Sequence, residues 1–243
     1  MKIIALIPAR SGSKSIKNKN IKNYLGEPLL VHSIKIAKIS EYISEIYVST
    51  DSKEYQDIAI KNGAHAPFLR PKNISGDLST DYECIDHFLN WYMNAKKNVP
   101  DLIIHLRPTY PNRSIKILNK AIELMQNNFE EYDSLRTIMP INKSGFKMYT
   151  VSNNTLHPFM NNCNIEEPHN LPRQSLPTTY MHNGYIDIIK SSTVLKQNSV
   201  SGKNILPFIM NSEEKFDIDT TDEWNLSEMS AKEKISKSNV LYW

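Results

Sequence analysis

Short apolar runs alternate with longer amphipathic segments in the first half of the chain. Residues 3–7 are aliphatic throughout and rich in β-branched side chains, which is typical of a strand buried on both faces of a parallel sheet, and Pro8 ends this run. Residues 29–38 have near-helical apolar spacing, and residues 43–49 suit a second strand. The chain is therefore expected to open as strand, loop, helix and strand.

The same alternation continues to about residue 126. Residues 66–69 are expected to form an edge or connecting strand that leads to Arg70. The pattern predicts a long helix over residues 79–97, a buried strand over residues 102–106 and another helix over residues 115–126. Repeated alternation of strands and helices predicts an α/β fold with a doubly wound, mostly parallel sheet.

Asp51 follows the second expected strand, where two roles are open to it. Either Asp51 or Thr50 is placed to cap a helix that ends near Gly63. At the carboxyl end of a strand, Asp51 would instead face a ligand. Capping is the commoner role for an aspartate before a helix, so Asp51 is not counted here among the site residues.

The alternation breaks after Pro140. Residues 141–172 mix Asn, Pro, Gly and Ser with short apolar pieces, which is too irregular for a long helix and too long for an ordinary loop. We expect a single domain over residues 1–243, with an excursion at about 141–172 that serves as a lid or a dimer arm. Strand signals return at residues 179–181, 185–189, 205–209 and 216–218, and a terminal helix is expected over 221–235.

Composition narrows the class of protein. A chain of 243 residues with 40% hydrophobic content can bury one sizeable core, and a net charge of +3 gives no general case for a nucleic-acid partner. Cys84 and Cys163 form no CxxC pair, so neither a zinc site nor a disulfide framework is indicated. The first apolar run is too short for a signal peptide, and no stretch approaches the roughly 18 residues of a membrane span. We expect a cytoplasmic protein without a membrane partner.

A loop rich in cations follows the first strand. Ser11, Gly12 and Ser13 let backbone amides turn towards a ligand, and no acidic residue occurs between residues 10 and 22. The cations of this loop are Arg10, Lys14, Lys17, Lys19 and Lys22. Their position beyond the carboxyl end of a strand predicts a polyphosphate site, although a solvated basic loop would have the same composition. The loop matches neither the Walker A nor the Rossmann glycine pattern.

The loop sequence IPARSGSKSIKNKNI resembles the opening of the acylneuraminate cytidylyltransferases, which activate nonulosonic acids and whose signature reads close to IPARGGSKGIPxKNI. Four later segments resemble motifs of that family in the same order: VSTDSKEYQDIAIKNGAHAPFLRP, LRPTYPNR, LPRQSLPTTYMHNGYI and FDIDTTDEW. The resemblance implies a nucleotidyltransferase-like fold and a homodimer, with an extension near residues 141–172 that reaches the partner subunit. Ser15 and Lys17 depart from the Gly and Pro of the family signature.

The resemblance also implies a reaction. The anomeric hydroxyl of an acidic nine-carbon sugar attacks the α-phosphorus of CTP, and pyrophosphate leaves, a displacement catalysed mainly by positioning and charge neutralisation. Arg10, Lys14 and Lys19 are then the catalytic cations. Ser79 or Thr80 would equally serve as the N-cap of the long helix. The residues implied to bind CTP are Arg10, Ser13, Lys14, Lys19, Asn20, Arg70, Asp77, Ser79 and Thr80.

Asp217 and Asp219 are the expected metal ligands. Spaced by two on an expected strand, they project from one face and can both reach a Mg²⁺ ion or another divalent cation, which would assist the departure of pyrophosphate. A structural alternative is that Thr220 and Glu223 form a capping box and that Asp219 belongs only to the start of that helix. The resemblance favours metal ligation.

A second group of residues is expected to bind the acceptor sugar. Arg173 offers a fork for its carboxylate, and Gln174, His182 and Asn183 are available for hydroxyl or amide groups. Asn183 and Gly184 have the alternative of forming a hairpin turn.

Arg107 is the most informative departure from the family. It stands where the sialic acid enzymes commonly carry Gln near the sugar, so an acceptor such as legionaminic or pseudaminic acid is expected in place of plain N-acetylneuraminic acid. Tyr110, in place of the usual Ser, points the same way. Two alternatives stay open: the related enzyme for 3-deoxy-manno-octulosonate, whose Pro-Gly-Lys-Pro segment this chain lacks, and a non-catalytic nucleotide-sugar sensor.

Overall fold

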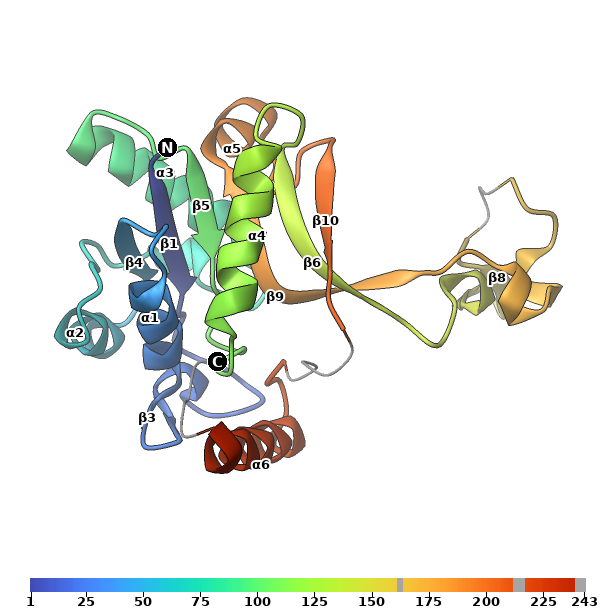
Figure 1. The fold of residues 1–243 in the computed structure, drawn as a ribbon, viewed down its shortest axis with the longest axis horizontal. Coiled ribbons are helices and arrows are strands. Elements are labelled where there is room, and N and C mark those ends of the chain that lie inside the picture. Colours follow the sequence, from blue (N-terminus) through green and yellow to red (C-terminus); the bar gives the residue numbers. More distant parts are fainter. Residues whose placement is uncertain (161–163, 212–216, 239–243) are drawn as a thin grey trace. The chain divides into compact units, whose positions relative to one another are not determined.

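The protein is described by a computed structural model over residues 1–160, 164–211 and 217–238. A sheet of six strands has the order β10-β6-β9-β5-β1-β4 (Figure 1). The strands are β1 (Ile3–Pro8), β4 (Glu45–Ser49), β5 (Leu102–His105), β6 (Ser134–Pro140), β9 (Tyr180–Lys190) and β10 (Ile205–Ile209). β1 pairs in parallel with β4 and β5, whereas β5 pairs antiparallel with β9. The expected α/β class with a mostly parallel sheet is confirmed, with β9 as an antiparallel member.

Helices cover both faces of this sheet, which is why β1 is apolar without alternation. Ile4 and Leu6 pack in one core with Phe88 and Leu89 of α3, and the alternate residues of β1 are equally buried on the other face. Figure 1 shows α1 and α4 in front of the sheet. The helices are α1 (Leu29–Ile39), α2 (Lys53–Lys61), α3 (Asp81–Lys96), α4 (Ile115–Asn127), α5 (Ser191–Gln197) and α6 (Thr221–Ser238).

The chain divides into two compact units. The larger unit comprises residues 1–137, 184–208 and 216–243, and the smaller unit comprises residues 138–183 and 209–215, each as far as it is described. The irregular stretch expected over 141–172 lies in the smaller unit. Short strands pair as β2 (Asn23–Tyr24) with β3 (Glu27–Pro28) in the larger unit and as β7 (Tyr149–Ser152) with β8 (Thr155–Pro158) in the smaller one.

Several local expectations are corrected by the structure. The N-cap of α2 is Ser52, so neither Thr50 nor Asp51 caps this helix. Asn183 and Gly184 lie inside β9, so the hairpin alternative is wrong. Asp217 and Asp219 lie in no strand, and Phe216, the first residue of that expected strand, lies outside the described residues. β6 and α5 had no counterpart among the expected elements.

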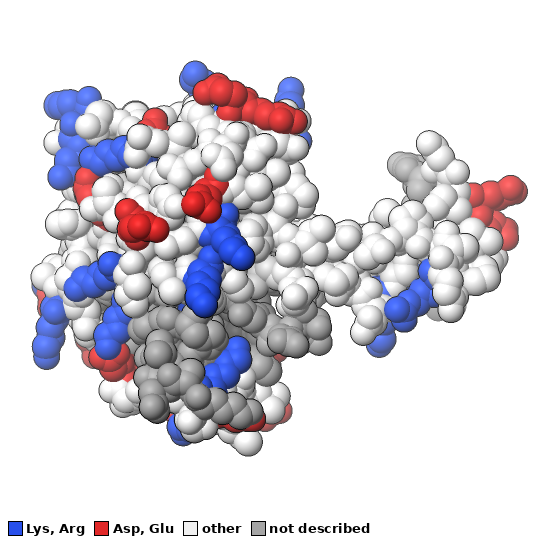
Figure 2. Space-filling view, viewed as in Figure 1, with Lys and Arg blue, Asp and Glu red and all other residues white. Residues whose placement is uncertain are grey.

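The remaining expectations on the chain concern caps, cysteines and membrane spans. Thr80 caps α3 in a capping box with Glu83, as one of the two alternatives predicted. Cys84 is buried and free, and Cys163 lies outside the described residues. Among the helices of residues 1–160, 164–211 and 217–238, none is long and apolar enough to cross a membrane. On the face drawn in Figure 2, basic and acidic side chains are interspersed over the larger unit.

Candidate active site

The basic loop after β1 is held from two sides. Asp51 accepts hydrogen bonds from the backbone nitrogen and the hydroxyl of Ser11, both at 2.7 Å. The Asn20 amide donates to the carbonyl oxygen of Arg10 at 2.9 Å. Gly12, between these anchors, has a φ of +74°, which an L side chain rarely adopts. Asp51 therefore fixes the path of the loop, a role that neither of its two expected functions included.

A pocket of about 200 Å³ lies at the carboxyl ends of β1 and β5, entirely within the larger unit. Pro8, which ends β1, and Thr109, which follows β5, both line it. Most of the residues expected to bind CTP meet there: Arg10, Ser13, Lys19, Asn20, Arg70, Ser79 and Thr80. The topology thus joins the basic loop to the start of α3, as ligand sites of open α/β sheets require.

Asp77 joins Lys14 to this group. Its carboxylate accepts a hydrogen bond from Arg10 Nη1 at 2.8 Å and forms an ion pair with Lys14. The neighbouring Lys14 and Arg10 cations hold the pKa of Asp77 below its ordinary value. All three side chains are at least one third exposed, so the contacts are screened by solvent. That Asp77 binds CTP stays a prediction.

Arg70 lines the pocket, and its guanidinium is buried. Only 6% of the residue is exposed, and within the described part of the chain its Nε and Nη2 atoms have no hydrogen-bond partner. Its backbone nitrogen donates to the Thr50 carbonyl at 2.7 Å, which fixes the residue beside β4. Buried guanidinium donors without acceptors cost free energy, so this position suits a ligand that supplies carbonyl or ring-nitrogen acceptors.

Lys19 connects the basic loop to the segment before α6. Its ammonium donates to the Ile218 carbonyl at 2.8 Å and to Asp219 Oδ1 at 3.0 Å. The Ile218 nitrogen donates in turn to the Thr109 carbonyl at 3.0 Å, so the segment is pinned between the loop and the end of β5. The structure thereby brings Asp217 and Asp219 to the basic loop, over about 200 residues of chain.

Asp217 has the properties of a metal ligand. Its Oδ1 atom is buried and has no hydrogen-bond partner among the described residues. Burial raises the pKa of this carboxyl; the Thr109 hydroxyl lowers it, the Asp219 charge raises it again and Lys19 lowers it. A divalent cation at Asp217 would relieve the cost of burying the charge.

Asp217 and Asp219 are the two carboxylates that could bind such an ion. The described residues contain no group of three or more His, Cys, Asp or Glu side chains that could enclose a metal. Mg²⁺ keeps several waters and commonly takes one or two carboxylates together with substrate phosphates, so the pair fits it. The capping box of α6 also exists, since Glu223 accepts from the Thr220 and Asp219 nitrogens at 2.8 and 2.9 Å. The capping box uses only the backbone nitrogen of Asp219. Its expected place at the start of α6 is therefore compatible with metal ligation by its carboxylate.

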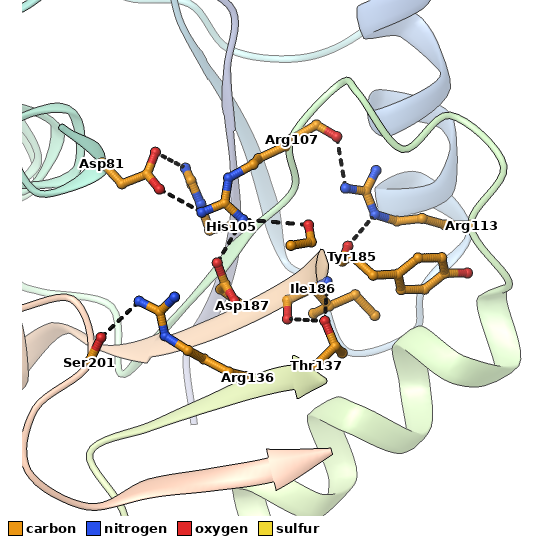
Figure 3. Close-up of polar contacts among 11 residues, drawn as sticks. Asp81, His105, Arg107, Arg113, Arg136, Thr137, Tyr185, Ile186, Asp187 and Ser201 are labelled. Carbon is orange, nitrogen blue, oxygen red and sulfur yellow. Dashed lines mark hydrogen bonds and ion pairs between the residues drawn. The ribbon is translucent and has the colours of Figure 1, made fainter. Parts of the chain in front are cut away.

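Arg107 lines the pocket within a cluster of charged residues that was not predicted from the sequence (Figure 3). It donates to Asp81 Oδ2 at 2.5 Å and to Asp187 Oδ2 at 2.7 Å. His105 is fully buried beside them, with Nε2 at 3.8 Å from Asp81, and burial lowers its pKa to about 4. The signal was present in the sequence, because Asp187 interrupts an apolar strand, and a buried carboxylate needs a partner.

Arg113 fixes the chain that follows β5. Its guanidinium is buried, and burial lowers its pKa to about 10, so it stays charged at neutral pH. The acceptors around it are the carbonyls of Tyr185, Tyr110 and Arg107, at 2.7, 2.6 and 2.7 Å, and the Ser33 hydroxyl at 3.1 Å. Tyr110 is buried with its ring edge-on to Tyr185 and does not line the pocket, so packing explains it.

The other residues expected to bind the acceptor belong to the smaller unit. Arg173 and Gln174 lie in a short 3-10 helix, and both are exposed. His182 is exposed on β9, whereas Asn183 is buried, with its amide nitrogen 3.3 Å from Met210 Sδ. Their place at the acceptor stays a prediction.

The fold and the site together define a nucleotidyltransferase: an α/β sheet, a basic loop after its first strand, and a carboxylate pair tied to that loop by a lysine. Residues 4–205 match the family model described as Cytidylyltransferase, and the chain belongs to this family. The chain is therefore an enzyme of the nucleotidyltransferase class, and its α/β fold was predicted correctly from the sequence.

Known relatives agree with this membership. The chain is 30% identical to CMP-N,N'-diacetyllegionaminic acid synthase of Legionella pneumophila, covering 94% of this chain and 95% of the relative. It is 29% identical to a pseudaminic acid cytidylyltransferase of Campylobacter jejuni, covering 96% and 97%. A solved CMP:2-keto-3-deoxy-manno-octonic acid synthetase complexed with CTP shares the fold, with a TM-score of 0.69, 15% identity and coverage of 96% and 100%.

Proposed function

We propose that this cytidylyltransferase transfers CMP from CTP to the anomeric hydroxyl of an acidic nonulosonic sugar of the sialic, legionaminic or pseudaminic type and releases pyrophosphate. The observation that carries the proposal is the contact of Lys19 with Ile218 and Asp219, which joins the basic loop to a carboxylate pair. Phosphoryl transfer depends on this kind of positioned charge.

The loop cations and the anchored backbone would hold the triphosphate. Arg10, Lys14 and Lys19 neutralise charge that builds on the leaving pyrophosphate, and because Asp51 and Asn20 already fix the loop, little reorganisation accompanies binding. Ser13 adds a hydroxyl at the same place. The nucleoside would lie towards Arg70, Ser79 and Thr80. There it would supply acceptors for the buried guanidinium nitrogens of Arg70.

Asp217 and Asp219 would hold Mg²⁺ or another divalent cation. When bound, the ion would polarise phosphate oxygens and offset their charge. The support is the unpartnered, buried Oδ1 of Asp217 and the chemistry of two oxygen-donor side chains. The Lys19 ammonium orients Asp219 through its hydrogen bond to Oδ1.

The relatives support a nine-carbon acceptor over 3-deoxy-manno-octulosonate. Curated relatives at about 30% identity are named for legionaminic and pseudaminic acid, whereas the octulosonate enzyme is a likeness of fold at 15% identity. A nucleotide-sugar sensor would have no need of the loop cations and the carboxylate pair together. The expected cytoplasmic location stays a prediction.

We also propose that the smaller unit is a dimer arm, one of the two roles expected for its irregular stretch. Its β7–β8 hairpin exposes large apolar side chains, and uncharged side chains cover much of this unit on the face shown in Figure 2. Apolar surface of this kind on a small unit is typical of an interface between subunits. The exposed side chains include Tyr149, Val151, Leu156 and Phe159.

A panel of acidic sugars tests the activity. The purified chain is incubated with CTP, Mg²⁺ and, in separate reactions, N-acetylneuraminic, legionaminic, pseudaminic and 3-deoxy-manno-octulosonic acids, and pyrophosphate release is measured. We expect release that depends on both the metal and a nonulosonic acid. Release of pyrophosphate with 3-deoxy-manno-octulosonic acid alone would favour the octulosonate enzyme. Binding of CTP without release in the presence of any acid would favour the sensor.

A further inference from the structure

α6 contacts the rest of the larger unit through a narrow buried stripe. Over the part of this helix whose side chains the structure describes, the buried residues are Trp224, Ser227 and Ala231, which share one helical face. The middle of the stripe is polar, because Ser227 is 0% exposed. A buried hydroxyl needs a hydrogen-bond partner, so the elements packed against α6 have to supply one.

Asn112, in the loop between β5 and α4, supplies that partner. Its amide nitrogen donates to Ser227 Oγ at 3.0 Å, to the Ser227 carbonyl at 3.2 Å and to the Tyr24 hydroxyl at 2.7 Å. The hydroxyls of Tyr24 and Ser227 are hydrogen-bonded to each other at 2.8 Å. A backbone carbonyl can only accept, so the Asn112 atom that faces it is the amide nitrogen. Side chains from β2, from α6 and from the loop after β5 thus close one set of hydrogen bonds.

The same loop holds the chain before α6 at a second point. The Thr109 carbonyl accepts a hydrogen bond from the Ile218 nitrogen at 3.0 Å. Ile218 lies between the two carboxylates proposed to bind a metal, and Ser227 lies about two helical turns beyond them. The loop after β5 therefore contacts this segment on both sides of the start of α6.

The loop is itself rigid. Arg113, which follows Asn112, is 1% exposed and donates to the carbonyls of Tyr110 and Arg107 in the loop and of Tyr185 in β9. Hydrogen bonds from a charged donor are roughly twice as strong as neutral ones. The position of Asn112 is therefore set by the central sheet and does not depend on α6.

The other contacts of α6 with the chain that follows the basic loop are less directional. The Lys22 ammonium lies 4.6 Å from the centre of the Trp224 ring, and the Leu25 nitrogen donates to Glu228 Oε1 at 3.4 Å, near the limit of a hydrogen bond. Apolar packing of Trp224 has no preferred direction. The shorter hydrogen bonds of Asn112 against the buried stripe are therefore the contacts that fix the rotation of α6.

We propose that Asn112 is a positioning residue of the active site, which fixes α6 so that Asp217 and Asp219 stand at the basic loop in the geometry that a divalent cation needs. This rests on the function proposed above and deepens it. A metal site requires its ligands within about 0.5 Å of the productive geometry, and a small rotation of α6 about its axis moves the carboxylates by more than that. Asn112 acts through Ser227 and does not touch the substrates.

The test separates positioning from stability. Asn112→Leu removes the amide at similar size and leaves Tyr24 and Ser227 paired with each other, so no buried hydroxyl loses its last partner. Ser227→Ala removes the same contact from the side of α6 and keeps the test valid if Asn112→Leu does not fold. Thr193→Val is the matched control, because it removes a buried hydrogen bond to the Asp133 carbonyl on an element that does not line the pocket.

Two quantities are measured for each variant. The first is the Mg²⁺ concentration that gives half of the rise in melting temperature, which needs no turnover, together with the Mg²⁺ concentration for half-maximal pyrophosphate release well below the melting temperature. The second is the Kd of CTP without divalent metal, by calorimetry. We expect Asn112→Leu and Ser227→Ala to raise the half-saturating Mg²⁺ concentration about tenfold and to change the metal-free Kd of CTP less than about twofold.

Thr193→Val should lower the melting temperature and leave the half-saturating Mg²⁺ concentration unchanged. The double variant Asn112→Leu/Ser227→Ala should need no more Mg²⁺ than Asn112→Leu alone, since both changes remove one contact. Unchanged Mg²⁺ dependence in Asn112→Leu or Ser227→Ala, an equal rise in Thr193→Val, or additive effects in the double variant would each overturn the inference. Absence of turnover in a wild type whose melting temperature still rises with Mg²⁺ would instead defeat only the proposed function.

Discussion

Lys19 is the residue on which the site converges. It is 8% exposed, and its ammonium contacts the Ile218 carbonyl and Asp219. A cation held in this way before the substrate arrives needs no reorganisation during reaction, and the low dielectric of a buried site strengthens its field. The other loop lysines differ in this respect, because Lys14 and Lys17 are exposed.

Replacing Lys19 should therefore damage catalysis far more than replacing a neighbouring lysine. We expect Lys19→Ala to lower kcat/KM for CTP by roughly 100-fold or more. Lys17→Ala, which removes an exposed cation of the same loop, should change it less than about threefold. Steady-state kinetics and a melting curve check both; near-normal kinetics of Lys19→Ala would remove the loop from the mechanism.

Asp217 makes metal binding measurable without turnover. Because its pKa is raised in the free fold, its ionisation destabilises that fold as the pH rises through this value, and a bound cation reverses the effect. We expect Mg²⁺ to raise the melting temperature at pH 7.5 and to do so less at pH 5, where more of the carboxyl is protonated. Asp217→Asn should abolish the rise, while Asp222→Asn, in the first turn of α6, should keep it.

Asp219 should separate turnover from nucleotide binding. Its carboxylate is 68% exposed and is oriented by Lys19, so its loss would remove one of the two proposed metal ligands with little effect on the core. We expect Asp219→Asn to lower kcat by about 100-fold and to change the KM for CTP less than tenfold. An increase in KM alone would show that Asp219 serves nucleotide binding.

At the scale of elements, the site depends on what holds the loop between β1 and the 3-10 helix Lys19–Ile21. Asp51, at the end of β4, accepts two hydrogen bonds from Ser11, and Asn20 reaches back to Arg10. Loops can position binding and catalytic residues accurately when a rigid scaffold fixes them. Here the neighbouring parallel strands β1 and β4 supply that scaffold.

Loss of the Asp51 anchor should raise the KM for CTP while leaving the cations in place. We expect Asp51→Ala to cost about 2 kcal/mol of stability, because hydrogen bonds to a charged acceptor contribute on that order, and to raise the KM severalfold. Asp51→Asn retains an acceptor for the Ser11 nitrogen and should lose about half as much. Equal KM values for wild type and Asp51→Ala would show that the loop keeps its path without this carboxylate.

At the scale of the whole molecule, the chain combines a larger unit that contains the entire pocket with a smaller unit that exposes apolar side chains. Val151 is 70% exposed and Leu156 is 63% exposed, and they are paired across the β7–β8 hairpin on one of its faces. Burial of such a face against a second copy would remove apolar surface from water and stabilise a dimer.

Charges on that face should disrupt the dimer. We expect Val151→Asp/Leu156→Asp to be monomeric at micromolar concentration by light scattering, with the melting behaviour of the larger unit retained. Thr150→Asp, on the opposite face of the same hairpin, should remain dimeric because its side chain points away from Val151. A monomeric wild type would defeat the proposal of a dimer arm.

The fold class and the position of the basic loop were readable from local pattern alone. Unbroken apolar runs such as residues 3–7 belong to strands buried on both faces, and α1, α3 and α4 appear within a few residues of their expected bounds. β6 was missed because Arg136 and Thr137 interrupt its apolar residues, and α5 was missed because it has only seven residues of mixed composition. Asp51 and Asp187 were missed or misjudged because their partners, Ser11 and Arg107, lie 40 and 80 residues away.

The sequence by itself determined the alternation of strands and helices, the cation-rich loop and the family to which the chain belongs, because these depend on residue type and spacing along a short stretch. Only the tertiary structure decided that Lys19 meets Asp219, that Asp51 anchors the loop and that the charge of Arg107 is compensated. Those facts follow from the order in which the strands assemble in the sheet, which brings distant segments to one edge and fixes which charges face one another.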